Sequence, residues 1–284
     1  MKISIATALL EASQFLRKGD VPEARREAGS LLAHVIDKDR TFLISHAEDL
    51  LTEEDFHRFR EIVKRRAAGE PLQYITGRQD FYGREFRVSP AVLIPRPETE
   101  LLVESALEVL TDDARFCDVG TGSGCIAITL LCERPSTRGV GVDISDPALR
   151  IAKQNAEALG VADRLTLVRS DCFDSLLDET FDMIVSNPPY VSADVIPGLQ
   201  REVKDHEPMV ALTPGSDGLS IIRRLLDEAP RHLRKDGFMF LEIGFDQGDA
   251  VRELVNADVW ELIDIKPDLQ GIPRIVVLKN VKRD

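Results

Sequence analysis

The sequence predicts a two-part α/β protein, with a small helical bundle ahead of a larger domain built on a mostly parallel sheet. Three observations predict this fold class. Residues 1–75 carry only the apolar spacing of helices, residues 115–278 alternate strand and helix patterns, and a glycine-rich turn follows the first of those strands. A chain of 284 residues is long enough to build one large domain and one small one.

The first 75 residues are predicted to form a helical bundle. Pro22 follows Asp20 and Val21, and proline suits the first turn of a helix, where its missing N–H costs nothing. Thr52–Asp55 resembles a capping box for a later helix, and residues 69–71 (Gly-Glu-Pro) are expected to end it. Between Pro22 and Thr52, apolar residues with helical spacing occur at Ala28, Leu31, Leu32, Val35 and Ile36.

Residues 76–96 are predicted to form a β-hairpin linker. Two short extended runs lie at 80–83 and 85–88, and Ser89-Pro90 follows them. Further on, residues 95–97 (Pro-Arg-Pro) fix the chain ahead of a helix expected from Glu98 to Leu110. The second domain is therefore expected to span residues 97–284.

Seven strands are predicted after residue 115. Helical patterns separate most of them, so a parallel sheet with helices on both faces is expected. The last two strands are separated by a loop at 267–273 rather than by a helix, which predicts antiparallel neighbours. The candidates are Phe116–Val119, Gly139–Asp143, Leu165–Val168, Met183–Ser186, Phe238–Ile243, Val259–Ile265 and Arg274–Leu278.

The glycine-rich turn has the features of a cofactor site. Its glycines let the backbone approach a ligand, and the helix that follows offers free N–H groups. About twenty residues later the second strand ends at Asp143, where a carboxylate suits the two hydroxyls of a ribose. The glycines fall at every second position, unlike the Gly-x-Gly-x-x-Gly of dinucleotide sites, which favours S-adenosylmethionine. The turn comprises Gly120, Thr121, Gly122, Ser123 and Gly124.

Purely structural interpretations of this region remain open. The glycines could form a purely structural turn, and Asp143 could cap the next helix, although Asp146-Pro147 suits that role better. The third strand ends at Asp171-Cys172, where an adenine ring is expected if the ribose binds Asp143. The Asp171 carboxylate or the Cys172 backbone would then bond the adenine edge, and the alternative is a loop acid beside a core cysteine.

Asn187, Pro188, Pro189 and Tyr190 follow the apolar run at 183–186, at the carboxyl end of the predicted fourth strand. Strands one and four of a doubly wound sheet flank the switch point where ligands bind. The tetrapeptide and the glycine-rich turn are therefore expected to face one crevice. A stiff Pro-Pro turn with a core tyrosine is the structural alternative.

The tetrapeptide suits a planar amide or amino nitrogen as the methyl acceptor. An amide nitrogen is a weak nucleophile, because its lone pair is delocalised into the carbonyl. The Asn187 side-chain oxygen and the Pro188 carbonyl would accept its two N–H groups and aim it at the sulfonium methyl. Pro189 stiffens the loop, and Tyr190 is predicted to stack on the planar substrate group.

Composition narrows the function classes. A net charge of −13 and a pI near 5.0 argue against a nucleic-acid partner, which would require a basic face. No apolar run approaches the roughly 20 residues of a membrane span, and the first residues lack the features of a secretory signal. A cytoplasmic monomer is expected. No metal site is expected, because no Cys-x-x-Cys pair occurs among Cys117, Cys125, Cys132 and Cys172.

These motifs resemble those of the HemK/PrmC family of protein-glutamine N5-methyltransferases, and the resemblance covers essentially the whole chain. It is carried by Asp118–Gly124, Asp143 and Asn187–Tyr190, and also by Pro95–Glu100, Glu207-Pro208 with Ala211-Leu212, and Gly215–Leu219. The resemblance implies a Rossmann-like class I methyltransferase fold with a seven-stranded, mostly parallel sheet, preceded by the helical bundle and hairpin linker.

The resemblance also implies a substrate and a set of site residues. This family methylates the glutamine of the Gly-Gly-Gln tripeptide of class I peptide-chain release factors and converts S-adenosylmethionine to S-adenosylhomocysteine. Carried over, Asn187–Tyr190 bind the glutamine, whereas Gly120–Gly124, Asp143 and Asn187 bind the cofactor. Cys172 would lie beside the adenine, where some relatives have a large aromatic residue, and Asp118 would reach the methionine end. The two-domain layout with its hairpin linker leads to the further hypothesis that residues 1–75 bind the release factor.

The segment ahead of the second domain is expected to organise the site rather than to touch substrate, through Arg96, Thr99 and Glu100.

Three alternative functions remain. A ribosomal-protein glutamine methyltransferase shares the tetrapeptide, although residues 96–100 look more like the release-factor enzymes. An adenine-N6 DNA methyltransferase would use the same tetrapeptide on a base flipped out of the helix. The acidic net charge argues against this interpretation. A silent binding module would keep the fold but fail to bind S-adenosylmethionine.

Overall fold

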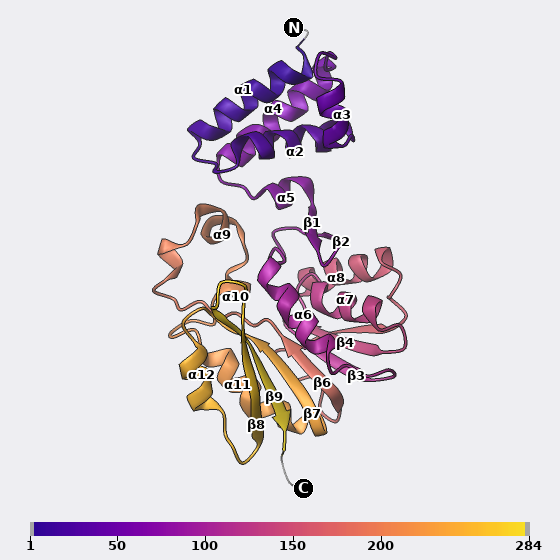
Figure 1. Ribbon diagram of the computed structural model, residues 1–284, viewed down its shortest axis with the longest axis vertical. Coiled ribbons are helices and arrows are strands. Elements are labelled where there is room, and N and C mark those ends of the chain that lie inside the picture. Colours follow the sequence, from indigo (N-terminus) through magenta and orange to yellow (C-terminus); the bar gives the residue numbers. More distant parts are fainter. Residues whose placement is uncertain (1–2, 282–284) are drawn as a thin grey trace. The chain divides into compact units, whose positions relative to one another are not determined.

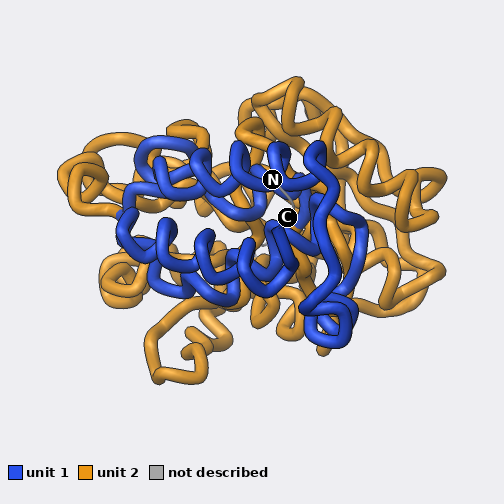
Figure 2. Tube along the Cα trace, turned by 90° about the horizontal axis from the view of Figure 1, so that it is seen from above, with its two compact units in different colours: residues 1–78, 200–206 blue, residues 79–199, 207–284 orange. Residues whose placement is uncertain are grey.

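The computed structural model describes residues 3–281 and divides into two compact units (Figure 2). The first unit comprises residues up to 78 together with 200–206, and the second comprises 79–199 and 207 onward. Met1 and Lys2, which belong to the segment compared with a secretory signal, lie outside the described residues. So do residues 282–284, the last three of the expected second domain.

The first unit is a helical bundle, as the sequence predicts (Figure 1). Its core is formed mainly by α1, α2 and α4, which pack through Leu16, Leu31 and Phe59. The short helix α9 comes from a distant part of the sequence and was not expected here. The helices are α1 (Ile5–Lys18), α2 (Ala24–Ile36), α3 (Arg40–Ser45), α4 (Glu53–Ala67), α5 (Leu72–Thr76) and α9 (Arg201–His206).

Two local expectations for this unit have different outcomes. The Thr52 cap is confirmed, because its hydroxyl oxygen accepts the Asp55 N–H at 3.0 Å at the start of α4. The expected position of Pro22 in the first helical turn is wrong. Pro22 lies in a turn, and α2 begins two residues later at Ala24, with Glu23 as its N-cap residue.

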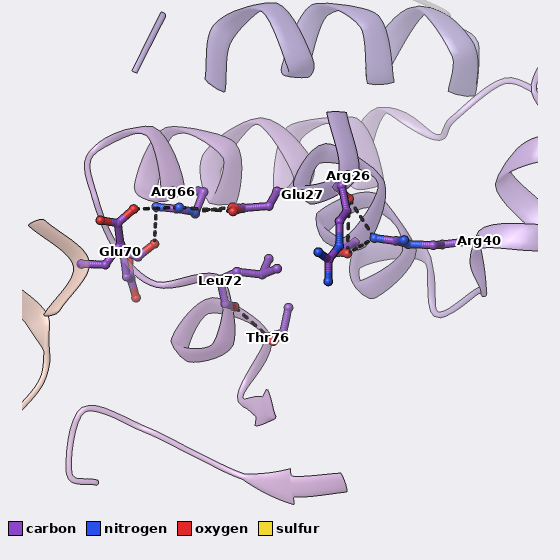
Figure 3. A network of polar contacts seen from close by, with 9 residues as sticks. Arg26, Glu27, Arg40, Arg66, Glu70, Leu72 and Thr76 are labelled. Carbon is purple, nitrogen blue, oxygen red and sulfur yellow. Dashed lines mark hydrogen bonds and ion pairs between the residues drawn. The ribbon is translucent and has the colours of Figure 1, made fainter. Parts of the chain in front are cut away.

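A buried arginine joins three segments of the first unit (Figure 3). The guanidinium of Arg66, on α4, donates to the Glu27 carboxylate on α2 and to Glu202 Oε1 on α9 at 2.9 Å. It also donates to the Glu70 carbonyl at 3.4 Å. Only 5% of the Arg66 side chain is exposed, so these partners replace the water that a free guanidinium would bind.

Arg66→Ala is therefore expected to lower the stability of this unit by about 3–5 kcal/mol, because Glu27 would keep a largely buried charge without its partner. Arg58→Ala is the matched control. Arg58 lies on the same helix, but its ion pair with Asp55 is exposed and contributes at most about 1 kcal/mol. Urea unfolding of the full chain measures both variants, and equal losses would contradict the role assigned to Arg66.

The second unit contains a seven-stranded sheet in the order β5-β4-β3-β6-β7-β9-β8. All seven predicted strands are present, with shifted ends, and the expected antiparallel pairing of the last two is confirmed. The first five strands in this order, β5, β4, β3, β6 and β7, are parallel to one another, whereas β9 runs antiparallel to β7. The strands are β3 (Arg115–Val119), β4 (Arg138–Asp143), β5 (Leu165–Arg169), β6 (Phe181–Ser186), β7 (Leu233–Glu242), β8 (Trp260–Pro267) and β9 (Pro273–Asn280).

Alternate strand residues enter two separate hydrophobic cores, one on each face of the sheet. Phe116 and Met183 pack with α6, α7 and α8, whereas Cys117 and Ile184 pack with α11 and α12. The unit is thus a three-layer α/β/α sandwich (Figure 1). Its helices are α6 (Glu100–Leu107), α7 (Cys125–Glu133), α8 (Asp146–Ala158), α10 (Met209–Leu212), α11 (Ser220–Glu228) and α12 (Gly248–Leu254), with 3-10 turns η1 (Pro97–Thr99), η2 (Ile196–Gly198) and η3 (Ala229–Arg231).

The helix expected from Glu98 to Leu110 is shorter than predicted. It begins as the 3-10 turn η1 and is α-helical only over α6. The Arg134 guanidinium donates to the carbonyl of Leu107, the last residue of α6, and to that of Leu110, and so satisfies backbone groups at and beyond the end of the helix.

The predicted hairpin is formed by β1 (Arg78–Phe81) and β2 (Arg84–Arg87). Its turn residues Tyr82 and Gly83 both have positive φ, as a two-residue hairpin turn requires. No helix in the described part of the chain has the length and apolar character that crossing a membrane requires.

Candidate active site

The strand register brings three loops together at one edge of the sheet. Val119, the last residue of β3, pairs with Val142 on β4 and with Ser186 on β6. Asp143 and Asn187 therefore follow on either side of the glycine-rich turn. The Ser186 hydroxyl donates to the Val119 carbonyl at 2.7 Å and ties the two central strand ends together.

A cavity of about 280 Å³ opens at this edge of the sheet. Most of the predicted site residues line it, and Gly124 and Tyr190 do not. Most residues of two further segments, 91–96 and 208–214, also line it, mainly with apolar side chains. The predicted residues in the lining are Gly120, Thr121, Gly122, Ser123, Asp143, Cys172, Asn187, Pro188 and Pro189.

The glycine-rich turn needs glycine for two different reasons. Gly120, Gly122 and Gly124 all have positive φ. A Cβ on Gly124 would also lie 2.7 Å from Ile128 Cδ1, so this glycine allows α7 to pack directly behind the turn. The Gly120 and Thr121 N–H groups both donate to the Val142 carbonyl at 2.9 Å, which holds the turn against β4.

Two backbone N–H groups hold the Asp143 carboxylate, one on each oxygen. The Gly122 N–H donates to Oδ2 and the Ser145 N–H donates to Oδ1, each at 2.9 Å. Burial raises the pKa of this carboxyl, and the backbone donors oppose that shift. Each oxygen keeps a lone pair for a ribose hydroxyl. The expected capping by Asp146 is wrong, because Ser145 is the N-cap residue of α8 and accepts the Ala148 N–H.

Asp118 lies beneath the turn and is not part of the cavity lining. Its Oδ2 accepts the Thr121 hydroxyl at 2.7 Å and the Ala127 N–H at 3.3 Å. Complete burial raises its pKa to about 7. Its Oδ1 has no hydrogen-bond partner among residues 3–281. Asp118 therefore joins the glycine-rich turn to the first turn of α7.

Cys172 lines the cavity at the end of β5, where the sequence places the adenine. Burial raises the pKa of its thiol to about 12, so the side chain offers neutral, soft surface rather than a thiolate. The neighbouring Asp171 carboxylate pairs with Arg224 at 2.8 Å, which also binds Asp174. Arg224 on α11 therefore holds the loop around Cys172 in place.

Asn187 presents one end of its amide to the protein and leaves the other end for a ligand. Its Nδ2 donates to the Thr99 hydroxyl oxygen at 3.0 Å. Within the described residues, no group donates to its Oδ1, which is therefore the available acceptor of this cavity-lining side chain. Gly120 lies close by, because a Cβ there would be 3.9 Å from the Asn187 carbonyl.

The tyrosine of the tetrapeptide is placed differently from the expected stacking position. Tyr190 packs against the core on the α11 and α12 face, and its hydroxyl donates to Glu242 Oε1 at 3.2 Å. The Gln247 amide donates to the Tyr190 carbonyl at 3.0 Å. A Cβ on Gly218 would lie 2.3 Å from that carbonyl oxygen, which explains why this position of the segment 215–219 is glycine. Tyr190 anchors the loop.

Two further residues, Glu207 and Asn155, also build the site. Glu207 accepts the Ile94 N–H and pairs with Arg96 at 2.6 Å, which fixes the segment at one wall of the cavity. Asn155, on α8, donates to the Ser123 carbonyl at 2.8 Å and exchanges two bonds with the Arg87 backbone. The sequence marks Glu207 only as part of the family resemblance and does not mark Asn155, because the partners of both residues are distant in the sequence.

The fold and the site together define a class I methyltransferase. Residues 97–200 match the family described as the methyltransferase small domain, and residues 7–77 match the PrmC N-terminal domain. A methyltransferase structure from Pyrococcus furiosus is similar with a TM-score of 0.54 and 18% identity, covering 80% of this chain and 99% of that one. This likeness shows the fold.

Curated relatives narrow the class. The release factor glutamine methyltransferase of Nitratidesulfovibrio vulgaris is 44% identical over 276 residues, covering 96% of this chain and 94% of that protein. The protein of the same name from Cereibacter sphaeroides is 46% identical over 271 residues, covering 95% and 96%. The chain belongs to the release factor glutamine methyltransferase family, as the sequence motifs predict.

Proposed function

We propose that this protein transfers the methyl group of S-adenosylmethionine to the side-chain amide nitrogen (N5) of the glutamine in the Gly-Gly-Gln motif of class I release factors. The observation that carries the proposal is the Asn187 amide. Its nitrogen is held by Thr99, and its oxygen is available in the cavity beside the glycine-rich turn. An acceptor at this position suits an incoming amide N–H. Family membership supports the same substrate.

The cofactor assignment rests on donors and acceptors of the chain itself. The Asp143 carboxylate has one lone pair on each oxygen for the ribose hydroxyls, and Cys172 and Ile144 offer apolar surface for the adenine. Gly120–Ser123 bring backbone to the cavity wall without side-chain bulk at the glycines. When bound, S-adenosylmethionine supplies an electrophilic methyl group on a sulfonium.

The residues of the tetrapeptide then orient the acceptor nitrogen. Asn187 Oδ1 and the Pro188 carbonyl accept the two amide N–H groups, so the nitrogen lone pair faces the methyl donor. Both acceptors also favour the positive charge that develops on the nitrogen. Pro189 restricts the backbone that carries the Pro188 carbonyl. Solvent water can take the proton from the cationic nitrogen after methyl transfer, so no strong base is required beforehand.

The remaining features fit the same proposal. Residues 1–75 would bind the release factor, residues 76–96 would link the bundle to the methyltransferase domain at 97–284, and the protein would act as a cytoplasmic monomer. A ribosomal-protein glutamine would present the same amide to Asn187 and is the second candidate substrate. Adenine in DNA is disfavoured by the net charge of −13.

The test is methyl transfer from radiolabelled S-adenosylmethionine to a class I release factor, to the same factor with its Gly-Gly-Gln glutamine changed to alanine, to ribosomal protein and to DNA. Label on the unaltered factor alone is expected. Label on ribosomal protein alone, or on DNA, would overturn the substrate assignment. Deletion of residues 1–75 should reduce labelling of the factor far more than labelling of a Gly-Gly-Gln peptide, and equal losses would remove the binding role of the bundle.

A further inference from the structure

The segment that follows the tetrapeptide leaves the second unit and then returns to it. We call residues 191–212 the strap. Its two ends lie together in the second unit, where the Val191 N–H donates to the Leu212 carbonyl at 3.0 Å. Its middle, residues 200–206, belongs to the first unit and contains α9. The strap therefore begins directly after Tyr190 and has parts in both units.

The first unit holds α9 through an ion pair and a close approach of the backbone. Glu202 Oε1 on α9 accepts a hydrogen bond from the Arg66 guanidinium at 2.9 Å. Arg66 is itself fixed, because its guanidinium is buried and also binds Glu27. A Cβ on Gly69 would lie 2.8 Å from Arg201 Nε, so α9 packs closely against the turn that follows α4. Glu202 is thus a polar anchor of α9.

The returning part of the strap contributes to one wall of the cavity. Glu207 is the residue directly after α9, is 5% exposed and pairs with Arg96 at 2.6 Å. Pro208 and Val210 then line the cavity that Asn187 also lines. Since Glu207 is joined to α9 by a single peptide bond, a displacement of α9 pulls on this wall.

The helical bundle keeps its buried ion pair without Glu202. The Glu27 side chain is 15% exposed and supplies Arg66 with a carboxylate from within the bundle, whereas the Glu202 side chain is 29% exposed. Loss of Glu202 therefore strands no buried charge, unlike loss of Arg66. The effect of removing Glu202 is expected to fall on α9 and the strap instead of on the bundle.

We propose that Glu202 is a positioning residue, whose bond to Arg66 holds α9 in the helical unit and so fixes the part of the cavity wall within 208–214 for the glutamine substrate. The proposal rests on the function proposed above. It gives residues 1–75 a second role, which applies even to a substrate that makes no contact with the bundle. Without the bond, α9 detaches for part of the time, and the wall is correctly placed only in the remaining molecules.

The experiment uses the full chain with S-adenosylmethionine and two substrates, the intact release factor and a short Gly-Gly-Gln peptide. Glu202→Ala is expected to raise KM for both substrates about 10-fold, the change in an equilibrium that one hydrogen bond between charged groups produces. The Kd for S-adenosylmethionine should stay within about threefold, because Asp143 and the glycine-rich turn lie outside the strap. Loss of folded protein would instead lower kcat and leave KM unchanged.

The peptide separates this proposal from a role of the bundle in binding alone. A bundle that only binds the release factor would leave KM for the peptide unchanged in Glu202→Ala, and that result would overturn the proposal. Deletion of residues 1–75 removes Arg66 and should raise KM for the peptide by a similar factor, beside the larger loss for the intact factor.

Asp205→Ala is the matched control on the same helix. Asp205 is exposed and pairs with Arg201 within α9 at 3.7 Å, so its removal should leave KM for the peptide within about twofold of the wild type. Glu202→Gln keeps an acceptor oxygen for Arg66 and should recover most of the activity that Glu202→Ala loses.

Hydrogen exchange of the backbone amides at 200–206 measures the release of α9 directly, without any substrate. Exchange should be faster in Glu202→Ala than in Asp205→Ala, and equal rates in the two variants would overturn the proposal. Failure of the proposed function is distinguishable, because the wild type itself would then leave both the release factor and the peptide unlabelled.

Discussion

Asn187→Ala is expected to lower kcat for release-factor methylation by about 10²–10³-fold, the usual effect of removing one preorganised group that stabilises developing charge. The variant loses the acceptor for one substrate N–H and leaves the Pro188 carbonyl to hold the nitrogen alone. The amide can then rotate, so fewer encounters aim its lone pair at the methyl group. Steady-state kinetics with the intact factor measures the loss.

The controls for this variant separate chemistry from folding. Asn256→Ala makes the same side-chain change in an exposed loop between α12 and β8 and should leave kcat unchanged. S-adenosylmethionine binding by Asn187→Ala should stay within a few-fold of the wild type, because Asp143 and the glycine-rich turn are intact. A variant that keeps kcat within about threefold would remove Asn187 from its assigned role.

The parts of the fold that could be predicted are those whose signal is local. Strand alternation, the positive-φ glycines and the acid at the end of β4 each lie in a few consecutive residues, and the parallel register then places them at one edge. Seven strands were therefore predictable. Their ends were less so, since β7 begins at Leu233, beyond a register shift opposite Phe181–Met183 that no sequence pattern marks.

The contacts that orient the site could not be predicted, because they join distant residues. Asn187 and Thr99 are 88 positions apart, and Tyr190 and Glu242 are 52 apart. The sequence alone made Tyr190 a stacking residue, since an aromatic side chain after Pro-Pro suits a planar ligand. The structure places its hydroxyl on a buried carboxylate. Likewise, α9 follows the tetrapeptide in sequence but belongs to the helical unit through Arg66 and Glu202.

Asp143→Ala is expected to weaken S-adenosylmethionine binding by at least about 100-fold. Two hydrogen bonds from ribose hydroxyls to a charged acceptor contribute about 1.5–3 kcal/mol each by mutational comparison, and each 1.4 kcal/mol is tenfold in Kd. The variant also frees the Gly122 and Ser145 N–H groups that the carboxylate holds at 2.9 Å. The turn between β3 and α7 therefore loses part of its preorganisation. Isothermal titration calorimetry measures the change.

Asp146→Ala is the matched control, because Asp146 lies three residues further along the chain and forms an exposed ion pair with Arg169. It should bind the cofactor as the wild type does. Asp143→Asn should fall between the two, since an amide keeps one acceptor but places a donor where Asp143 accepts a backbone N–H. If Asp143→Ala and Asp146→Ala bound S-adenosylmethionine equally well, the ribose would not be held by Asp143. The cofactor would then have to bind through the glycine-rich turn and the Cys172 loop alone.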